Sequence, residues 1–496
     1  MRTLVVAYKK VDRQYLKTWE KDFKHALNLT TSNKDAQIAE VSARIEHDLT
    51  ILGITAVEDC LQDGVPKAIA TLKECGVRVW VLTGDKTETA VDIARSCMLF
   101  VDGTTLAYGT EAGSLEDALS RLQEAKQQLE GKSDAGLVLD GRTLQYALQS
   151  DECRQLIFEL GIASRSCVCC RLTPLQKRQL VELVREKDPS TITLAIGDGA
   201  NDVPMIEGAH LGIAVRGKEG AQAVQVSDVA ISQFRFLVPL LLCHGRRAYR
   251  RIAVYLCYYL YKNVVLAMGD VVWMHMDEYR GRIAFPEWVS INYNVFFTSW
   301  HILFLLGFDQ DVPDHVANSH PEIYLVGPRR ALFNKLIFSR WMIFAVYHGI
   351  VAWIVPYYMI SVDEVYNKEL PSQWWEGSIT SFTIIVLIVL LKLLLNTQSP
   401  LRFVTSILPT VASLVCYVMG LGIIGYMPMF TEPETGLQPN MKEIPGEVFG
   451  NTNALIAIVA VPAAVFITDL IFEVAWKSIW PSPLDKVKAS VRAGDA

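Results

Sequence analysis

The chain has 496 residues, which is long enough for more than one domain. Hydrophobic residues make up 51% of it and charged residues 20%, and nearly all the long apolar runs follow residue 250. A net charge of −6 excludes the strongly basic class of nucleic-acid-binding proteins. The ten cysteines lack the density and spacing of a disulfide framework. Cys167, Cys169 and Cys170 have no second pair at zinc spacing, so we assign them to a buried strand.

Before residue 240, short apolar runs alternate with helical patterns, after a polar helical segment at 12–50. The expected strands lie at 52–57, 77–82, 137–139, 166–171, 191–196 and 211–215. The expected helices lie at 63–75, 88–97, 174–186 and 203–209. Residues 101–135, rich in Gly, Ser, Glu and Gln, interrupt this alternation and are expected to form a surface insertion. Repeated strand–helix units predict an α/β fold with a doubly wound parallel sheet.

The strand at 191–196 ends in a turn with the sequence Gly-Asp-Gly-Ala-Asn-Asp. Its two carboxylates, Asp198 and Asp202, follow the carboxyl end of a parallel strand, where ligands bind in such sheets. Two carboxylates suit Mg²⁺, which completes its octahedron with water and substrate phosphate. The alternative is an Asp-Gly turn that only caps a helix.

Two other strand ends supply groups that suit a phosphate. Thr83 offers a hydroxyl, and the backbone amides of Gly84 and Asp85 lie at a helix start, where anions bind. Lys177 offers a point positive charge. Taken singly, Thr-Gly-Asp is equally a capping turn, and Lys177 fits equally on a solvated helix face. Together with a magnesium site, these groups describe phosphoryl transfer.

Six apolar stretches in the second half are near or beyond the roughly 20 residues that a membrane-spanning helix needs. They lie at 252–276, 288–308, 336–360, 379–395, 403–427 and 454–472. The segments on one side hold most of the Lys and Arg residues, whereas the opposite loops hold only Arg280, Arg282, Lys368 and Lys442. The positive-inside rule therefore predicts that both termini are cytosolic.

Lys262 lies well inside the first span, and an ionisable residue at that depth is costly and suggests a transport pathway. The alternative is a lysine that snorkels to the cytosolic interface. Asn292, Asn294 and Thr298, early in the second span, line the same path or simply bond between helices. The second span has no carboxylate, which argues against a cation pump, although Asp270 and His301 count the other way.

Three motifs together resemble the phosphorylation domain of P-type ATPases: Thr83-Gly-Asp-Lys, Cys170-Arg-Leu-Thr-Pro-Leu-Gln-Lys177 and Gly197-Asp-Gly-Ala-Asn-Asp202. They are most similar to the type IV branch, the phospholipid flippases. Phe308-Asp-Gln-Asp-Val312, after the second span, matches that branch as well. The resemblance covers nearly the whole chain, and it implies a haloacid-dehalogenase-like α/β fold followed by six membrane helices.

The resemblance also implies roles for individual residues. Lys262 and Asn263 are associated with passage of the lipid headgroup, and Asp198 and Asp202 with Mg²⁺. Thr83, Lys177 and Asp202 have the catalytic roles. The residues that match contacts to ATP or to the phosphorylated aspartate are Arg2, Thr83, Gly84, Asp85, Arg171, Lys177, Asn201 and Asp202.

One departure from the family is that no Asp-Lys-Thr-Gly-Thr occurs in the chain, so the aspartate that would accept the γ-phosphoryl group is missing. The dephosphorylation loop, most of the nucleotide domain and the first four membrane helices are also missing. The chain thus resembles the carboxyl-terminal part of a flippase, and we expect it not to form the phosphoenzyme alone.

The hypothesis is therefore ATP-driven transport of phospholipid from the exoplasmic to the cytosolic leaflet, in the plasma membrane or in Golgi or endosomal membranes. An accessory β-subunit is expected at the exoplasmic face, near the acidic loop at about 428–450. The domains expected are the end of a nucleotide-binding domain (1–50), a phosphorylation domain (51–240), a membrane domain (241–476) and a cytosolic tail (477–496). The rival hypotheses are a cation-transporting P-type ATPase and a truncated, non-catalytic membrane protein that binds nucleotide or a β-subunit.

Overall fold

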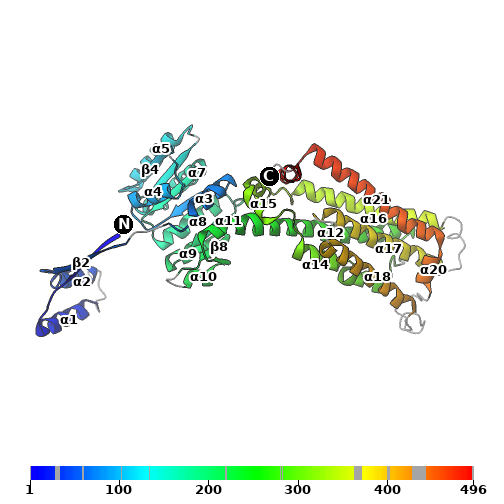
Figure 1. Cartoon of the computed structure of the whole chain (residues 1–496), viewed down its shortest axis with the longest axis horizontal. Helices are drawn as coiled ribbons and strands as arrows, with labels where there is room; N and C mark the ends of the chain where they lie inside the picture. The colour runs from blue at the N-terminus through cyan, green and yellow to red at the C-terminus, as the bar shows by residue number, and fades with distance from the viewer. Residues whose placement is uncertain are drawn as a thin grey trace. The chain divides into compact units, whose positions relative to one another are not determined.

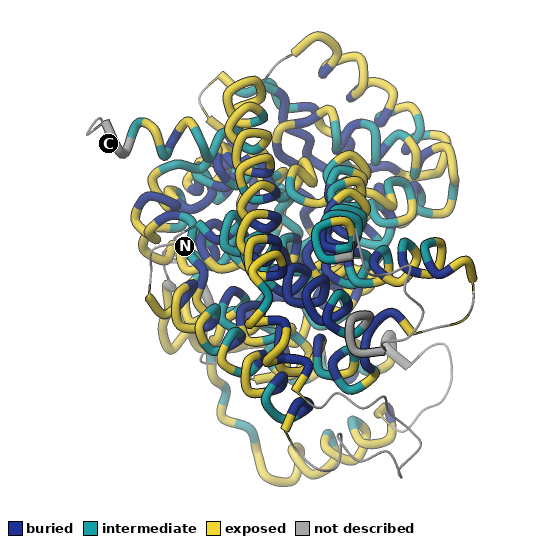
Figure 2. The backbone as a smooth tube through the Cα atoms, turned by 90° about the vertical axis from the view of Figure 1, so that its right-hand side faces the viewer, coloured by how far each residue is buried: buried dark blue, intermediate teal, exposed yellow. Residues whose placement is uncertain are grey.

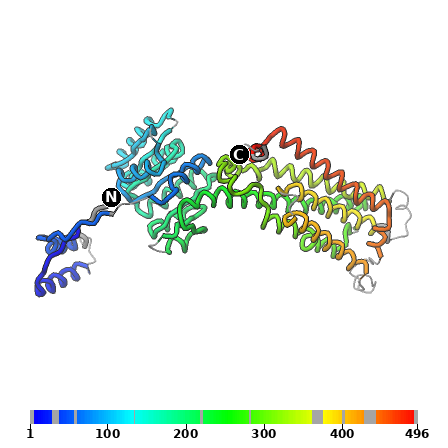
Figure 3. Tube along the Cα trace, viewed as in Figure 1, coloured from blue at the N-terminus to red at the C-terminus, as the bar shows by residue number. Residues whose placement is uncertain are grey.

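The computed structural model describes residues 2–27, 34–57, 61–101, 103–132, 134–217, 221–279, 281, 283–361, 371–398, 403–426 and 443–493. The chain divides into two compact units, Met1–Asp63 and Gly64–Ala496. Figures 1 and 3 follow the chain through both. Most of the acidic loop expected at 428–450 lies outside the described residues.

The first unit is a two-stranded antiparallel ribbon with two helices. Strands β1 (Arg2–Tyr8) and β2 (Thr50–Val57) pair along their length, and α1 (Arg13–Leu27) and α2 (Lys34–Ala43) lie between them in the sequence. The strand expected at 52–57 is present. However, its partner is β1, so it does not begin the parallel sheet as the alternating pattern suggested.

Four parallel strands form the first sheet of the second unit, in the order β3-β6-β5-β4. They are β3 (Val79–Leu82), β4 (Thr105–Gly109), β5 (Ala135–Asp140) and β6 (Ser166–Cys170). The inner strands β5 and β6 are buried along their whole length, as expected in a sheet covered on both faces. The cysteines of β6 are buried and free, which confirms their assignment to a buried strand.

Residues 101–135 form part of this sheet, so the prediction of a surface insertion is wrong. They contain β4, the outer strand, and helix α5 (Leu115–Leu129) (Figure 1). Ala118, Leu122 and Ala125 are fully buried on one face of α5. Their spacing of four and three residues is the stripe of an amphipathic helix, which the polar composition of the segment concealed.

Three more parallel strands form the second sheet: β7 (Leu194–Gly197), β8 (Leu211–Val215) and β9 (Val229–Ile231), in that order. Helix α9 (Val203–Gly208) follows β7, and α10 (Gln222–Val226) follows β8. Helix α3 (Val65–Glu74) joins the two cores, because Ile69 packs in the core of the first sheet and Leu72 in that of the second. The predicted parallel-sheet α/β region is therefore confirmed.

Four further helices cover the first sheet or connect its strands: α4 (Thr87–Ser96), α6 (Gly141–Ala147), α7 (Asp151–Ala163) and α8 (Pro174–Lys187). Helix α8 begins with a capping box between Thr173 and Gln176, and Pro174 occupies its first turn. Gly161 lets α7 approach β3, because a Cβ there would lie 2.3 Å from the ring of Trp80.

Within its described residues, the second half forms a bundle with six helices that are long and apolar enough to cross a membrane, as predicted. Span 1 includes α12 (Arg246–Met276), and span 2 consists of α13 (Glu287–Asn292), a π turn at Tyr293–Phe297 and α14 (Ser299–Phe308). The other four are α16 (Lys335–Ser361), α17 (Pro371–Asn396), α18 (Leu408–Tyr426) with a π turn before it at Phe403–Ile407, and α21 (Thr452–Ile479). Figure 2 shows how buried and exposed residues are distributed along the chain.

Short elements adjoin one end of the bundle. Before α12 lie 3-10 turn Phe234–Phe236, α11 (Leu237–Pro239) and a π turn at Leu240–Gly245. After α14 come α15 (Asp314–Ser319) and a 3-10 turn at Pro321–Val326, and after α21 comes α22 (Pro483–Ala493). At the opposite end of the bundle, short helix α20 (Ile444–Gly450) precedes α21 (Figure 1). Val487 of α22 packs with Cys243 and Val316 in one small core.

Candidate functional site

The loop after β3 is fixed to the end of β6. The Thr83 backbone N–H donates to Cys169 O at 2.9 Å, and the Leu172 N–H donates to Thr83 O at 3.0 Å. The Asp85 N–H donates to Thr83 Oγ1 at 3.1 Å, and the same hydroxyl lies 3.1 Å from Asp85 Oδ2. Thr83, Gly84 and Asp85 therefore form a tight turn at the carboxyl end of β3, where sequence analysis expected it.

Arg171 joins this turn through its backbone. Its N–H donates to Asp85 O at 2.9 Å, and its φ is 52°, which is uncommon for a residue with a Cβ. Gly141 permits this conformation to pack, because a Cβ there would lie 2.2 Å from Arg171 O. A residue held in such a conformation by its neighbours is a common feature of functional sites.

Lys177 and Asp202 form an ion pair with Nζ and Oδ1 2.8 Å apart. The side chains are only 11% and 15% exposed, so the pair is well shielded from water. Lys177 lies in the first turn of α8, and Asp202 ends the short 3-10 turn after β7. The ion pair therefore connects elements that follow two different sheets.

The turn after β7 brings Asp198 and Asp202 together. The Asp198 backbone N–H contacts Asp202 Oδ2 at 3.4 Å. Gly197 is required for this geometry, because a Cβ there would lie 2.4 Å from the Cβ of Asp202. Asp198 and Asn201 are exposed.

The carboxylates of Asp198 and Asp202 fit a magnesium ion that takes its remaining ligands from phosphate and water. Among the described residues, no group of three or more His, Cys, Asp or Glu side chains could hold a metal. Mg²⁺ does not require such a cage, because it commonly takes one or two carboxylates and completes its shell with water and phosphate. The donor set of Asp198 and Asp202 fits a metal that arrives with a phosphate group.

The remaining cofactor residue of the sequence analysis, Arg2, lies on β1 in the first unit, and its side chain is outside the described residues. Apart from Asn201, hydrogen bonds and an ion pair join the other residues of the predicted crevice in two groups. Thr83, Gly84 and Asp85 share a turn with Arg171, and Lys177 contacts Asp202, which contacts Asp198.

The second candidate site surrounds Lys262 on α12, which is 1% exposed. Its ammonium donates to Thr298 Oγ1 at 2.7 Å, and the rings of Tyr259 and Tyr293 lie 5.7 Å from it. Among the described residues, no carboxylate forms an ion pair with Lys262. The snorkelling alternative does not hold in this structure, because the side chain ends on span 2.

The π turn of span 2 explains how this contact forms. Tyr293 OH donates to Lys262 O at 2.9 Å, and Thr298 Oγ1 donates to Tyr293 O at 2.6 Å. Asn294 Nδ2 donates to Asn263 Oδ1 at 3.0 Å. A π turn leaves backbone carbonyls available and is often found at functional sites. Lys262, Asn263 and Asn294, named together from sequence, thus lie on two contacting helices.

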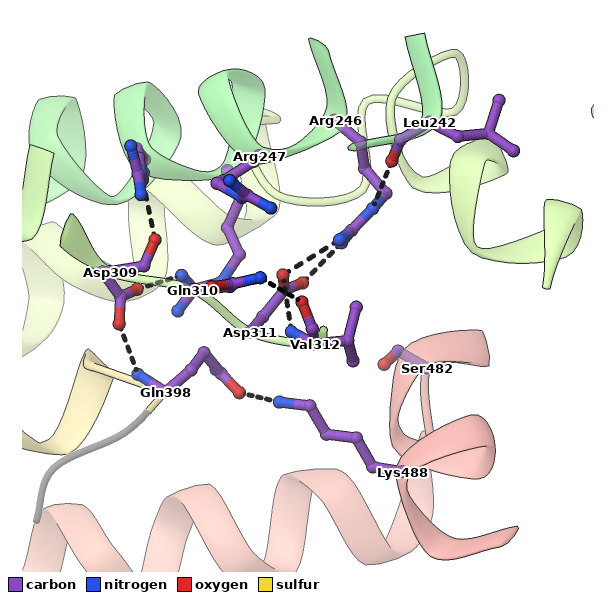
Figure 4. Close-up of polar contacts among 12 residues, drawn as sticks. Leu242, Arg246, Arg247, Asp309, Gln310, Asp311, Val312, Gln398, Ser482 and Lys488 are labelled. Carbon is purple, nitrogen blue, oxygen red and sulfur yellow. Dashed lines mark hydrogen bonds and ion pairs between the residues drawn. The ribbon is translucent and has the colours of Figure 1, made fainter. Parts of the chain in front are cut away.

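A third polar group, which sequence analysis assigned no role, joins the start of α12 to the segment after α14 (Figure 4). Arg246 forms two hydrogen bonds with Asp311, the longer 3.0 Å, and Arg250 pairs with Asp309. Burial alone would raise the pKa of Asp311, but the hydrogen bond and charge of Arg246 outweigh it and lower the pKa. The sequence signal for this group was the match of charge between the four arginines at the start of α12 and the three aspartates that follow α14.

Sequence analysis also missed ionisable residues inside other spans. His348, Lys392 and Asp469 lie within α16, α17 and α21 and contact one another. The rule applied to Lys262, that an ionisable residue inside an apolar run has a function by default, would have found them.

The fold and sites define an integral membrane protein with an attached parallel α/β region. A family model described as the C-terminal part of phospholipid-translocating P-type ATPases matches residues 224–482, just over half of the chain. The chain belongs to this family.

Three relatives indicate the extent of the similarity. Probable phospholipid-transporting ATPase IM of Homo sapiens is 35% identical over 426 residues, or 80% of this chain and 36% of the relative. Phospholipid-transporting ATPase DRS2 of Saccharomyces cerevisiae is 32% identical over 482 residues, 95% of this chain and 35% of the relative. Probable phospholipid-transporting ATPase 7 of Arabidopsis thaliana is 33% identical over 443 residues, which cover 86% of this chain and 35% of the relative. The chain spans just over a third of the length of these relatives.

Proposed function

We propose that this chain is the carboxyl-terminal part of an ATP-driven phospholipid translocase that works through an aspartyl-phosphate intermediate. Phospholipid would move from the exoplasmic to the cytosolic leaflet. The relatives are named phospholipid-transporting ATPases, and the two sites supply the chemistry that each half of such a cycle needs.

The ammonium of Lys262, which is buried and has no ion-pair partner in the described parts of the chain, is the observation that carries this proposal. Burying a cation without an anion is costly, and a hydroxyl such as that of Thr298 offsets only part of the cost. A phospholipid phosphate supplies the missing negative charge. Asn263 and Asn294, next to Lys262, offer amide groups for the rest of a headgroup.

The crevice of the α/β region would serve ATP hydrolysis. Lys177 would neutralise charge on the transferred phosphoryl group, and the turn at Thr83, Gly84 and Asp85 would hold its oxygens. Arg171 and Asn201 would hold the nucleotide. Asp198 and Asp202 would hold Mg²⁺, which screens phosphate charge when bound. Because Asp202 already pairs with Lys177, both residues would leave this ion pair during the reaction: Lys177 would turn to a phosphate oxygen, and Asp202 would serve Mg²⁺.

The strand order supports the proposal that the acceptor aspartate belongs to another segment. Strands β3 and β7 each end a sheet, and each precedes one of the site turns. One additional parallel strand between them would join the sheets into a haloacid-dehalogenase-like sheet. Its carboxyl end would lie between Thr83 and Asp198, where a nucleophile is needed.

The proposed topology follows from the distribution of positive charge. Both termini and the α/β region would be cytosolic, and the membrane would be the plasma membrane or a Golgi or endosomal membrane. The domains would be the end of a nucleotide-binding domain (1–50), a phosphorylation domain (51–240), a membrane domain (241–476) and a tail (477–496). A β-subunit would dock at the exoplasmic face.

Labelling with [γ-³²P]ATP tests the proposal. The complete polypeptide that contains this chain should acquire a hydroxylamine-sensitive phosphate, whose loss is accelerated by phospholipid. The 496-residue chain alone should remain unlabelled. Acceleration by a metal cation in place of lipid would favour a cation pump. Absence of label from the complete polypeptide would favour the non-catalytic alternative.

A further inference from the structure

Four residues from four spans form a row of polar contacts, here called the relay: Tyr261, His348 and Asp469, which are buried, and Lys392, which is partly buried. Tyr261 OH lies 2.5 Å from His348 Nδ1, and His348 Nε2 lies 3.6 Å from Asp469 Oδ1. Lys392 Nζ lies 3.0 Å from Asp469 Oδ2. Helix α12 packs against α16 and α17, and α16, α17 and α21 pack against one another. Tyr261 and His348 are fully buried, and Asp469 is 4% exposed.

The charges and protons of this relay have one consistent arrangement. Lys392 and Asp469 neutralise each other, while the nearby Arg340 has its own partner, Glu473, at 3.8 Å. If the Tyr261 hydroxyl donates to His348 Nδ1, the imidazole proton is on Nε2 and faces Asp469 Oδ1. At 3.6 Å these two groups are in contact but do not form a hydrogen bond, and neither His348 Nε2 nor Asp469 Oδ1 has a hydrogen-bond partner within the described chain. The relay therefore orients Tyr261 through its hydrogen bond with His348, which lies against the ion pair of Lys392 and Asp469.

Tyr261 is held on its ring as well as at its hydroxyl. The Trp341 ring meets it edge-on at 5.7 Å, and the ammonium of Lys392 lies 5.8 Å from its centroid. Tyr261 is thus fixed by residues of α16 and α17, whereas the next residue, Lys262, reaches span 2.

This arrangement determines how α12 is turned about its axis. Successive helical residues differ by roughly 100°, so any rotation of α12 that moved Tyr261 would swing the Lys262 ammonium away from Thr298. Contacts on both faces hold α12: the relay on one and the hydrogen bonds of Lys262 and Tyr293 on the other.

We propose that Tyr261, His348, Asp469 and Lys392 are positioning residues that hold Lys262 in register with the phosphate of the transported lipid. This inference rests on the proposed lipid-binding role of Lys262. The relay touches no substrate and acts by fixing the rotation of α12.

The test is a lipid titration of ATP hydrolysis by the complete polypeptide, with Tyr261→Phe as the main variant. The probes are mixed micelles containing phosphatidylserine, phosphatidylethanolamine or phosphatidylcholine, of which the most stimulating is used for the titration. Because only one buried hydroxyl is removed, the half-saturating lipid concentration should rise about five- to tenfold. The maximal rate and the phosphoenzyme level formed from ATP should change less than about twofold. His348→Gln should likewise raise the half-saturating lipid concentration and leave the maximal rate nearly unchanged. This second variant keeps the test decisive if Tyr261→Phe folds poorly.

Tyr258→Phe is the matched control, because Tyr258 is equally buried on α12 and its hydroxyl has no hydrogen-bond partner among the described residues. It should leave the lipid titration unchanged. Equal titrations for Tyr261→Phe and Tyr258→Phe would overturn the relay, as would a parallel loss of phosphoenzyme and lipid response. Lys262→Ala separates the two proposals: if it leaves lipid stimulation intact, the proposed lipid site itself fails. If it abolishes stimulation while Tyr261→Phe has no effect, only the relay fails.

Discussion

The α/β region and the membrane bundle each bury a lysine, but they treat its charge in opposite ways. Lys177 has a carboxylate partner, Asp202, 2.8 Å away. Lys262 is more deeply buried, and among the described residues its ammonium has no carboxylate partner; its hydrogen bond goes to the hydroxyl of Thr298, 2.7 Å away. A lysine with an internal partner keeps its charge balanced before substrate arrives, whereas a lysine without one favours the entry of an anion. The difference suits a crevice that exchanges partners during each cycle and a membrane site that must attract a headgroup.

The largest effect is expected in the crevice. Asp202→Asn, in the complete polypeptide, removes both the partner of Lys177 and a proposed magnesium ligand. Phosphoenzyme formation from [γ-³²P]ATP should fall by about a hundredfold to a thousandfold, the scale of losing a charge-stabilising group.

The matched control for this prediction is Glu207→Gln, an exposed carboxylate on the neighbouring helix α9. It should be phosphorylated at the parental rate. If Asp202→Asn were labelled as fast as this control, the ion pair of Lys177 would have no part in phosphoryl transfer.

The smallest effect is expected at a third lysine, Lys488, whose partner is a neutral amide oxygen. Lys488 of α22 donates to Gln398 Oε1, which belongs to the segment that follows α17 (Figure 4). Burial, which outweighs the attraction of Asp311, lowers the pKa of Lys488 from 10.5 to about 8. Between these values the docked helix binds fewer protons than a free one. Docking of α22 should therefore strengthen as the pH rises from about 8 toward 10.5 and should be weakest, and nearly constant, below pH 8.

Hydrogen exchange of the α22 amides, corrected for the intrinsic rate, measures this docking. Protection should be a few-fold greater at pH 9 than at pH 7, and Lys488→Met, which cannot titrate, should lose the difference. Equal protection of the parental chain at both pH values would show that Lys488 does not control the docking of α22.

Sequence analysis located features that are local in the chain. The turns at Thr83 and Asp198 follow short β-branched runs, and the six spans are continuous apolar stretches, so periodicity and composition were sufficient. Helix α5 was missed, because its buried stripe of Ala118, Leu122 and Ala125 stands among many polar residues.

Long-range pairings could not be derived in this way. The residues Tyr261, His348, Lys392 and Asp469 come from four different spans, and hydropathy does not indicate which helix faces which. The π turn that carries Thr298 toward Lys262 likewise has no sequence signature that we used. Sequence therefore identified Lys262 as unusual, but the absence of a carboxylate around it within the described residues became visible only in the structure.

The most direct test of this account gives Lys262 an internal anion of its own. Thr298→Asp places a carboxylate where the hydroxyl now accepts a hydrogen bond from the ammonium of Lys262. Thr298→Asn provides a control of the same shape without charge. The measurement is lipid-stimulated ATP hydrolysis by the complete polypeptide, with phosphoenzyme formed from ATP as the check on folding. The account predicts that Thr298→Asp forms phosphoenzyme but loses lipid stimulation, whereas Thr298→Asn keeps most of it. Equal lipid stimulation in both variants would contradict the claim that the unpaired charge of Lys262 binds the lipid.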